Sequence, residues 1–253
     1  LGWVGHGFFY VHERSSGKTL EFSFNQPLGF RTHLDATPQH GKSVFRKGWF
    51  SIQIVKRLGK REVEVRKLGR LLLKATLLEH SWQPLALCTP TAANGWTYTQ
   101  KSTALPVSGT LNFNGKKYDL SRECWLGATD DSCGMLRRET AWHWLSLSTR
   151  LATGVNETYG SENSAWLNGV LQELPPVLFE QREDYWSVRS ADERVKLRVT
   201  TGWSREESLN LGVVGSHFNQ WVSQVSGTIT LADGKVIRVD AVPCLLEKHF
   251  AKW

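Results

Sequence analysis

The residues best suited to chemistry are acids, an arginine and tryptophans gathered in one stretch, Val107–Trp144. Asp130 lies close to Arg138, and Trp142 and Trp144 follow two residues apart, which places both indoles on one face of a strand. A carboxyl buried against indole rings has a raised pKa and can protonate an apolar substrate, while indole faces stabilise developing positive charge. The same residues also fit a structural Asp–Arg pair that closes a barrel end beneath packed tryptophan. The sequence leaves both interpretations open.

Other stretches supply further polar and aromatic side chains. Ser161–Trp166 is a second dense patch, and the C-terminus adds an acid and a histidine. We take Asp130 and Glu162 as the candidate catalytic acids. The candidate ligand-binding residues share an aromatic, amide or ionisable side chain, and they are Arg138, Trp142, Trp144, Asn163, Trp166, Trp96, Tyr98, Glu247 and His249.

Familiar catalytic signatures are absent from the sequence, which contains no HExxH, GxSxG or Walker loop and no GxGxxG after a strand. The histidines do not cluster with carboxylates at metal-ligand intervals, and the four cysteines form no CxxC pair. We therefore predict no metal and no cofactor. Reduced cysteines and the lack of a membrane-spanning apolar run are typical of a cytoplasmic protein. Because the chain begins at Leu1 rather than Met, the sequence leaves open whether an N-terminal leader was trimmed.

The formal net charge of +7 is concentrated in one segment, Lys56–Lys74, which holds eight basic and two acidic residues. Within it Val63 and Val65 alternate with charged residues, as in a strand with one face in solvent. The pattern predicts the charged outer face of a sheet, and a weak membrane-surface contact through this segment is the alternative. Charge this local does not indicate a nucleic-acid binder.

An internal repeat organises the chain. Val107–Thr110 reads VSGT and recurs as Val225–Thr228, and each copy continues into an alternating arm, an Asn-Gly or Asp-Gly turn and a second arm. Two copies predict two similar β units, which we place at residues 1–135 and 136–253. Alternation with frequent turn signals, and no sustained helical spacing, predicts an all-β protein.

Four runs of residues resemble an uncharacterised bacterial family, that of the domain of unknown function 2804. They are Asn94-Gly95-Trp96-Thr97-Tyr98-Thr99-Gln100-Lys101 with Pro106-Val107-Ser108-Gly109 (family FxYTxKxxxLPxxG); Asp130, Gly134, Arg138, Thr140, Trp142 and Trp144 (DWxxGxxxRxTxWxWA); Gly154-Val155-Asn156, Glu162-Asn163 and Trp166 (GxNxxxGxxENxxW); and Glu247-Lys248-His249-Phe250-Ala251-Lys252-Trp253 (EDHxAxW). The chain departs from the family at Asp131, where Trp is usual, and at Lys248, where Asp is usual.

That family is similar to the lipocalin-like (calycin) superfamily, which includes carotenoid hydratases and tocopherol cyclase. The resemblance implies two lipocalin-like antiparallel β-barrel or sandwich units. In the hydratases an acid of this motif is thought to protonate an alkene, and Asp130 is the matching position.

Together these observations predict a protein that binds a hydrophobic small molecule, lipid or terpenoid-like, in a Trp-lined β-barrel cavity. The alternative is a cofactor-free, acid-catalysed hydratase, cyclase or isomerase acting on such a molecule. The expected partner is that small molecule, and no nucleic acid.

Overall fold

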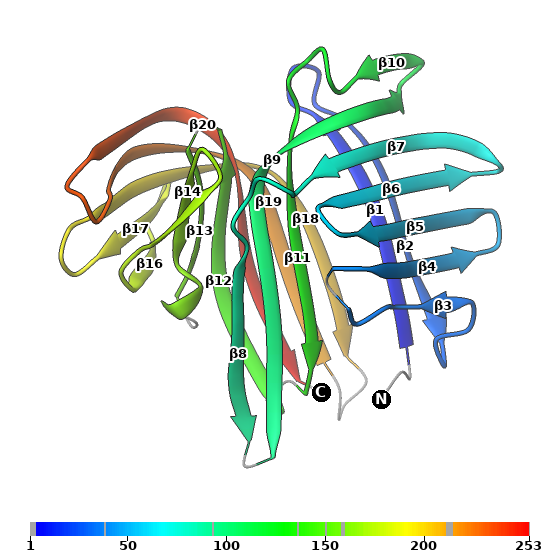
Figure 1. The fold of residues 1–253 in the computed structure, drawn as a ribbon, viewed down its shortest axis with the longest axis horizontal. Coiled ribbons are helices and arrows are strands. Elements are labelled where there is room, and N and C mark those ends of the chain that lie inside the picture. Colours follow the sequence, from blue (N-terminus) through cyan, green and yellow to red (C-terminus); the bar gives the residue numbers. More distant parts are fainter. Residues whose placement is uncertain are drawn as a thin grey trace. The chain divides into compact units, whose positions relative to one another are not determined.

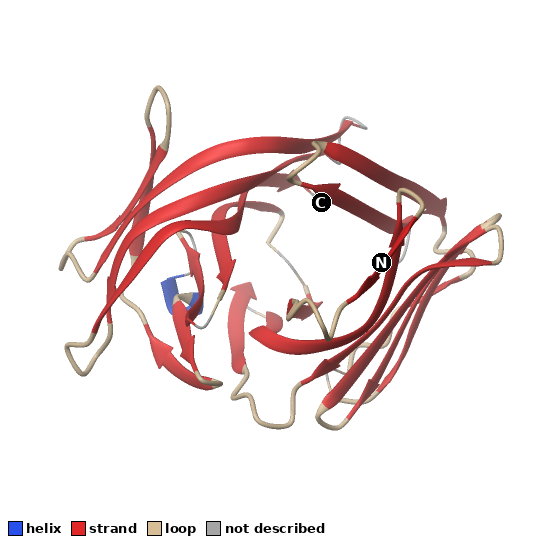
Figure 2. Cartoon of the chain, turned by 90° about the horizontal axis from the view of Figure 1, so that it is seen from above, coloured by secondary structure: helices blue, strands red, loops and turns tan. Residues whose placement is uncertain are grey.

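Strands dominate the computed structural model, which describes residues 4–37, 39–92, 94–135, 137–149, 151–157, 160–210 and 215–252 (Figure 1). In chain order the elements are β1 (Val4–Glu13), β2 (Lys18–Pro27), β3 (Thr32–His33), β4 (Gly41–Lys47), β5 (Phe50–Arg57), β6 (Lys60–Lys67), β7 (Arg70–Leu78), β8 (Leu85–Ala92), β9 (Gly95–Phe113), β10 (Lys116–Asp119), β11 (Leu126–Gly134), β12 (Glu139–Ser148), β13 (Leu151–Asn156), η1 (Gly160–Glu162), β14 (Ser164–Leu167), β15 (Val170–Glu173), β16 (Val177–Gln181), β17 (Trp186–Ser190), β18 (Val195–Asn210), β19 (Gly215–Thr230) and β20 (Val236–Lys252). In these ranges η1 is a single 3-10 turn among strands (Figure 2). The all-β class predicted from the sequence is confirmed. Across the described ranges, no helix has the length and hydropathy needed to cross a membrane.

The strands pack into two compact units, and each unit takes two segments of the chain. The first comprises Leu1–Ser81 and Leu105–Gly127, and the second comprises Trp82–Ala104 and Ala128–Trp253. The units are thus interleaved along the sequence. The division into consecutive domains at 1–135 and 136–253 stays a prediction.

The first unit contains the β1–β2 hairpin and the strands β3 to β7, which pair antiparallel in order, with the end of β9 beside β7. Turns at Leu58-Gly59 and Leu68-Gly69 join β5 to β6 and β6 to β7. Phe50 and Val65 point into the core of this sheet, together with Phe45. The expectation that the basic segment lies in solvent is wrong at two positions, because Lys56 and Arg61 are buried on the inner face.

The second unit is built on nine antiparallel strands in the order β15-β14-β13-β12-β20-β19-β18-β17-β16. Strands β18, β19 and β20 are the long curved ribbons in Figure 1. One face of this sheet carries an apolar core that includes Leu145, Leu147, Val188, Val225 and Leu246, each no more than 1% exposed. The other face of β12, β19 and β20 is therefore the one left for polar side chains.

The repeated VSGT motif has the same geometry in both units. Gly109 has φ +124° and is paired with Ala75, whereas Gly227 has φ +143° and is paired with Leu197. A Cβ on Gly109 would lie 2.0 Å from the carbonyl oxygen of Lys74, and a Cβ on Gly227 would lie 2.1 Å from that of Lys196. The motif is repeated because each copy places glycine where the chain crosses close to a neighbouring carbonyl.

We expect Gly227→Ala to lower the free energy of unfolding by roughly 2–4 kcal/mol, because it combines backbone strain with a clash against backbone. Gly234→Ala is the matched control in the same hairpin, since Gly234 has φ +83° and open space around it. The control should cost about 1 kcal/mol through strain alone. Urea denaturation measures both values, and equal losses would contradict this explanation of the repeat.

Candidate functional site

The ammonium of Lys101 is the centre of a charged cluster in the second unit. Its Nζ lies 3.1 Å from Oδ2 of Asp130 and 3.0 Å from Oε2 of Glu162. The same Nζ lies 5.0 Å from the centroid of the Trp144 ring, within cation–π range. Burial acts to lower the pKa of Lys101, but the two carboxylates outweigh it and raise that pKa. The cluster joins β9, β11, η1 and β12.

Four neighbouring strands add a row of polar residues beside this cluster. Arg205 of β18 is opposite Gln220 of β19, Gln220 is opposite Glu247 of β20, and Glu247 is opposite Trp144 of β12. Directly opposite residues share a face, so the four side chains lie on the side away from the apolar core. Arg205 is buried and forms an ion pair with Glu207.

The surroundings of Glu247 in this row change the pKa of its carboxyl. Burial raises the pKa of Glu247 above its ordinary value, and the negative charge of Asp130 adds to the effect. Two hydrogen bonds to this carboxyl lower its pKa and so oppose burial. The Nε2 of Gln220 donates to Oε1 at 2.5 Å, and the side chain of Trp142 forms the other hydrogen bond. Burial dominates, so Glu247 retains a proton at a higher pH than an exposed glutamate does.

His249 lies opposite Trp142 and completes the aromatic part of this face. The two rings meet edge to face with centroids 4.3 Å apart, and Phe218 contacts the histidine from β19 at 5.3 Å. The Oγ of Ser216 lies 3.0 Å from Nε2 of His249. Burial, together with the charge of His217, lowers the pKa of His249 to about 4, so the ring is neutral at pH 7.

Six of the residues proposed from the sequence therefore gather on one face or at its edge: Asp130, Glu162, Trp142, Trp144, Glu247 and His249. The sequence interpretation missed Lys101 and Gln220, which contact four of the six. Lys101 stands in the quoted family run, yet a lone lysine on an alternating strand gives no signal of its own. The pairing of Gln220 with Glu247 becomes evident only once the register of β19 and β20 is known.

Two aromatic candidates lie on the other face of β9. Trp96 and Tyr98 are separated from Lys101 by odd numbers of residues, so their side chains point away from the ammonium. Trp96 is exposed, and the hydroxyl of Tyr98 donates to Oε1 of Gln100 at 2.8 Å. These two residues do not join the cluster around Lys101.

Three further candidates hold local structure or lie at the surface. The amide of Asn163 is buried and donates to the carbonyl of Pro175 at 3.0 Å. The buried indole of Trp166 donates to the carbonyl of Gln83 at 2.8 Å. Arg138 is exposed immediately before β12. The buried amide and indole have the contacts of framework residues.

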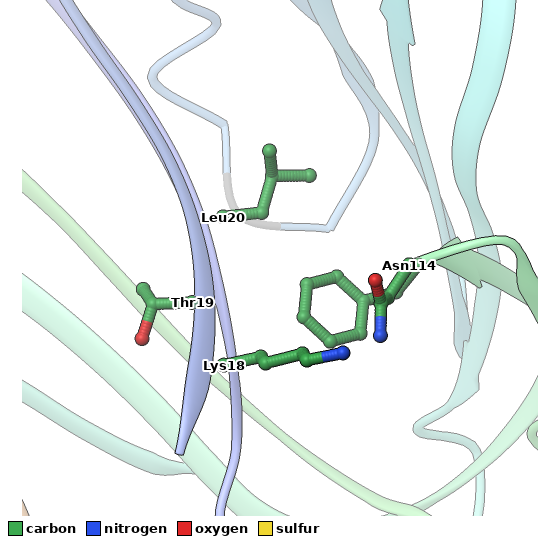
Figure 3. A pocket seen from close by; sticks show the side chains of 5 residues that line it. Lys18, Thr19, Leu20 and Asn114 are labelled. Atoms are coloured by element: carbon green, nitrogen blue, oxygen red, sulfur yellow. The ribbon is translucent and has the colours of Figure 1, made fainter. Parts of the chain in front are cut away.

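A small open hollow, with a volume of about 270 Å³, lies elsewhere, in the first unit. Figure 3 shows Lys18, Thr19, Leu20 and Asn114 around it, and Phe113 completes the lining. None of these five residues is a tryptophan, so this hollow differs from the cavity expected from the sequence. Across the described ranges, no three His, Cys, Asp or Glu side chains are placed to hold a metal ion.

We expect Lys101→Met to destabilise the second unit by roughly 2–3 kcal/mol, because it leaves two carboxylates facing each other without their ammonium. Lys196→Met is the control, since Lys196 pairs at 2.9 Å with Glu193 in solvent and should cost less than about 1 kcal/mol. Chemical denaturation at pH 7 gives both values. Equal losses would show that the Lys101 cluster behaves as an ordinary surface ion pair.

His249 should make stability depend on pH. The unfolded chain protonates this histidine near 6.5, whereas the folded chain resists protonation until about pH 4. Between these values the unfolded state binds more protons, so the free energy of unfolding falls as the pH is lowered, by at most about 3 kcal/mol. We expect His249→Gln to lose this slope and the exposed His33→Gln to keep it, measured by denaturation from pH 7 to pH 4. A slope that survives in His249→Gln would assign it to other groups.

Comparisons with known proteins agree with this fold. The chain resembles a solved structure of kievitone hydratase from Nectria haematococca, with a TM-score of 0.54 and 8% sequence identity over 100% of this chain and 81% of that one. A structure of a proposed AttH from Nitrosomonas europaea matches with a TM-score of 0.42 and 13% identity over 98% of this chain and 80% of that one. No curated protein matches the chain in sequence. The model of the domain of unknown function DUF2804 matches residues 1–253, and the chain therefore belongs to that family.

Proposed function

We propose that the chain binds a hydrophobic small molecule, lipid or terpenoid-like, on the face of the second unit formed by β12, β19 and β20. The observation that carries the proposal is the set of half-buried rings of Trp142, Trp144 and His249 on the side of the sheet opposite the packed core. Ligand sites combine mainly apolar and aromatic surface with a few placed polar groups. Here those polar groups are a carboxyl with a raised pKa and a histidine that is neutral at pH 7.

The two indoles would take different parts in binding. One face of Trp144 already holds the ammonium of Lys101, so that ring contributes its edge or its other face. Trp142 contacts His249 and forms a hydrogen bond with Glu247, which fixes its orientation. A ring held in place by its neighbours loses little conformational entropy on binding, so it is a suitable contact for an apolar ligand.

We expect Trp142→Leu to weaken binding of a fluorescent fatty acid or retinoid by about ten-fold, because it removes a large apolar contact area. Trp96→Leu is the matched control, since Trp96 lies on the outer part of β9 away from the cluster. Fluorescence titration gives both dissociation constants, and thermal melts establish that each variant is folded. Equal weakening in both variants, or no binding by the wild-type chain, would contradict the proposed face.

Acid catalysis on the same face is the second candidate, and the raised pKa of Glu247 favours it. Asp130 and Glu162 each have an oxygen engaged by the Lys101 ammonium, whereas burial raises the pKa of Glu247. Glu247 is therefore the better general acid, in place of the two acids chosen from the sequence. Its O–H would protonate an alkene carbon, water would attack the resulting cation, and that water would return a proton to the Glu247 carboxylate.

The fold likeness to a protein named as a hydratase is compatible with this second candidate, but at 8% identity it extends to the fold alone. The burial of Glu247 is the stronger support. Burial is the main cause of the raised pKa of this carboxyl, so it favours the neutral form that can donate a proton.

We expect Glu247→Gln to abolish turnover while ligand binding stays within about three-fold, because the amide keeps the size of the side chain and cannot donate an acidic proton. The assay follows deuterium incorporation from D₂O into an isoprenoid alkene by mass spectrometry. Activity of the wild-type chain should fall as the pH rises through the raised pKa of Glu247. Full activity in Glu247→Gln would remove this residue as the acid, and no incorporation by the wild-type chain would leave binding as the function.

A further inference from the structure

Three loops meet at one end of the sheet in the first unit. They are Pro27–Arg31 between β2 and β3, Arg46–Trp49 between β4 and β5, and Arg66–Arg70 between β6 and β7. The amide of Arg46 donates to the carbonyl of Arg31 at 3.1 Å, and the amide of Leu68 donates to the carbonyl of Trp49 at 2.8 Å. The β4–β5 and β6–β7 turns lie side by side at the right of Figure 1. We call this surface the loop end.

Large apolar side chains project into solvent from the tips of all three loops. Their exposed fractions are 76% for Leu28, 65% for Phe30, 45% for Trp49 and 67% for Leu68. Scattered exposed apolar residues are ordinary, but several gathered at one end of a sheet indicate a contact surface.

Two of these residues also have an unfavourable backbone conformation. Leu28 has φ +54° and Leu68 has φ +49°, in the left-handed region where Gly, Asn and Asp are preferred. Leu68 precedes Gly69, whose φ of +73° completes a turn of the type in which Asn-Gly is common. The exposure of both leucines leaves little apolar burial to offset the strain, so a role outside the folded chain is the better explanation for leucine at these positions.

Six cations surround these tips, and the three loops contain no acidic residue: Arg31, Arg46, Lys47, Arg66, Lys67 and Arg70. Lys47 and Lys67 are both paired with Phe50, and Lys67 is also paired with Arg70, so three of the cations form a row directly behind the turns. The Nζ of Lys67 lies over the rings of Phe22 and Trp49, at 4.6 and 5.3 Å. Glu64 lies two residues before the third loop, and its Oε1 accepts a hydrogen bond from Nε of Arg66 at 2.6 Å.

We infer that the loop end docks on a bilayer surface that carries anionic headgroups. Apolar tips with cations set one or two residues behind them match the order of a bilayer surface, where acyl chains lie beneath phosphates. Tryptophan is favoured at that boundary because its ring is apolar and its N–H is polar. The cations could also attract the phosphates of a nucleic acid. A nucleic acid offers no apolar phase for the two projecting leucines, so it fits this surface less well.

The opposite end of the same sheet is built differently and supplies a matched comparison. The β5–β6 turn carries the same Leu-Gly pair at Leu58-Gly59, and Leu58 is 86% exposed. The nearby Lys56 and Arg61 are buried, unlike the cations of the loop end, and Lys56 donates to the carbonyl of Thr37 while Arg61 pairs with Glu79. Membrane contact is thus expected from the loop end and not from the whole basic segment.

The test is sedimentation of the full chain with phosphatidylcholine vesicles that contain about 30% phosphatidylserine. We expect wild-type binding to weaken by about ten-fold or more in Leu28→Ser/Leu68→Ser, because both apolar tips are lost. Leu58→Ser should bind as the wild type does. Both leucines are exposed, so folding should be retained, and circular dichroism checks this. Binding should also fall strongly with pure phosphatidylcholine vesicles or with added salt.

Three results would overturn the inference. The first is equal vesicle binding by the double variant and the wild type, and the second is equal loss of binding in Leu58→Ser. The third is failure of the wild type to sediment with anionic vesicles. If the wild type then forms a dimer that the double variant does not, measured by analytical ultracentrifugation, the loop end is instead an interface between two copies of the chain. Tight binding to duplex DNA without vesicle binding would assign the cations to nucleic acid.

Discussion

The ion pairs of the Lys101 ammonium are the interaction on which the candidate site depends. Asp130 and Glu162 come from segments far apart in the sequence, and each has an oxygen within about 3 Å of the same nitrogen. A partly buried ammonium needs such partners, because burial alone would drive it toward its neutral form. With the carboxylates in place it stays charged and lies against Trp144. The cluster therefore fixes β9, β11 and η1 against β12 and holds one tryptophan of the site in position.

The same cluster lies beside a third carboxyl, whose pKa is raised. Lys101 compensates the charge of its two nearest carboxylates, and a third carboxyl, Glu247, lies close enough to be affected by Lys101 and Asp130. Its charged form is disfavoured by burial and gains only partial relief from Gln220 and Trp142. Burial thus raises the pKa of Glu247, while Asp130 and Glu162 on the same side lie within ion-pair distance of the Lys101 ammonium.

Much of the fold could be predicted from local patterns, whereas the site could be predicted only in part. Alternation and turns identified the strands, and the repeated Val-Ser-Gly-Thr motif marked two equivalent glycines. The two-residue spacing of Trp142 and Trp144 placed both on one face, as observed. The cluster around Lys101 was not predictable, because it depends on which distant strands become neighbours. Glu247 was proposed from the sequence as a ligand-binding residue, but its raised pKa could not be predicted, because it follows from burial that the sequence does not display.

Successive side chains of β12 alternate between the face with the polar cluster and the face with the apolar core. Trp142 and Trp144 face the polar cluster, while His143 between them points to the core side, with its Nδ1 2.5 Å from Oε2 of Glu157 and its ring stacked on Phe179. Leu145 follows in the apolar core. A shift of one residue in the pairing of β12 with β20 would exchange these faces and would turn Trp142 and Trp144 toward the leucine core. The apolar core that fixes this register is therefore also what keeps the tryptophans, Glu247 and His249 together, so stability and site geometry are not independent in this unit.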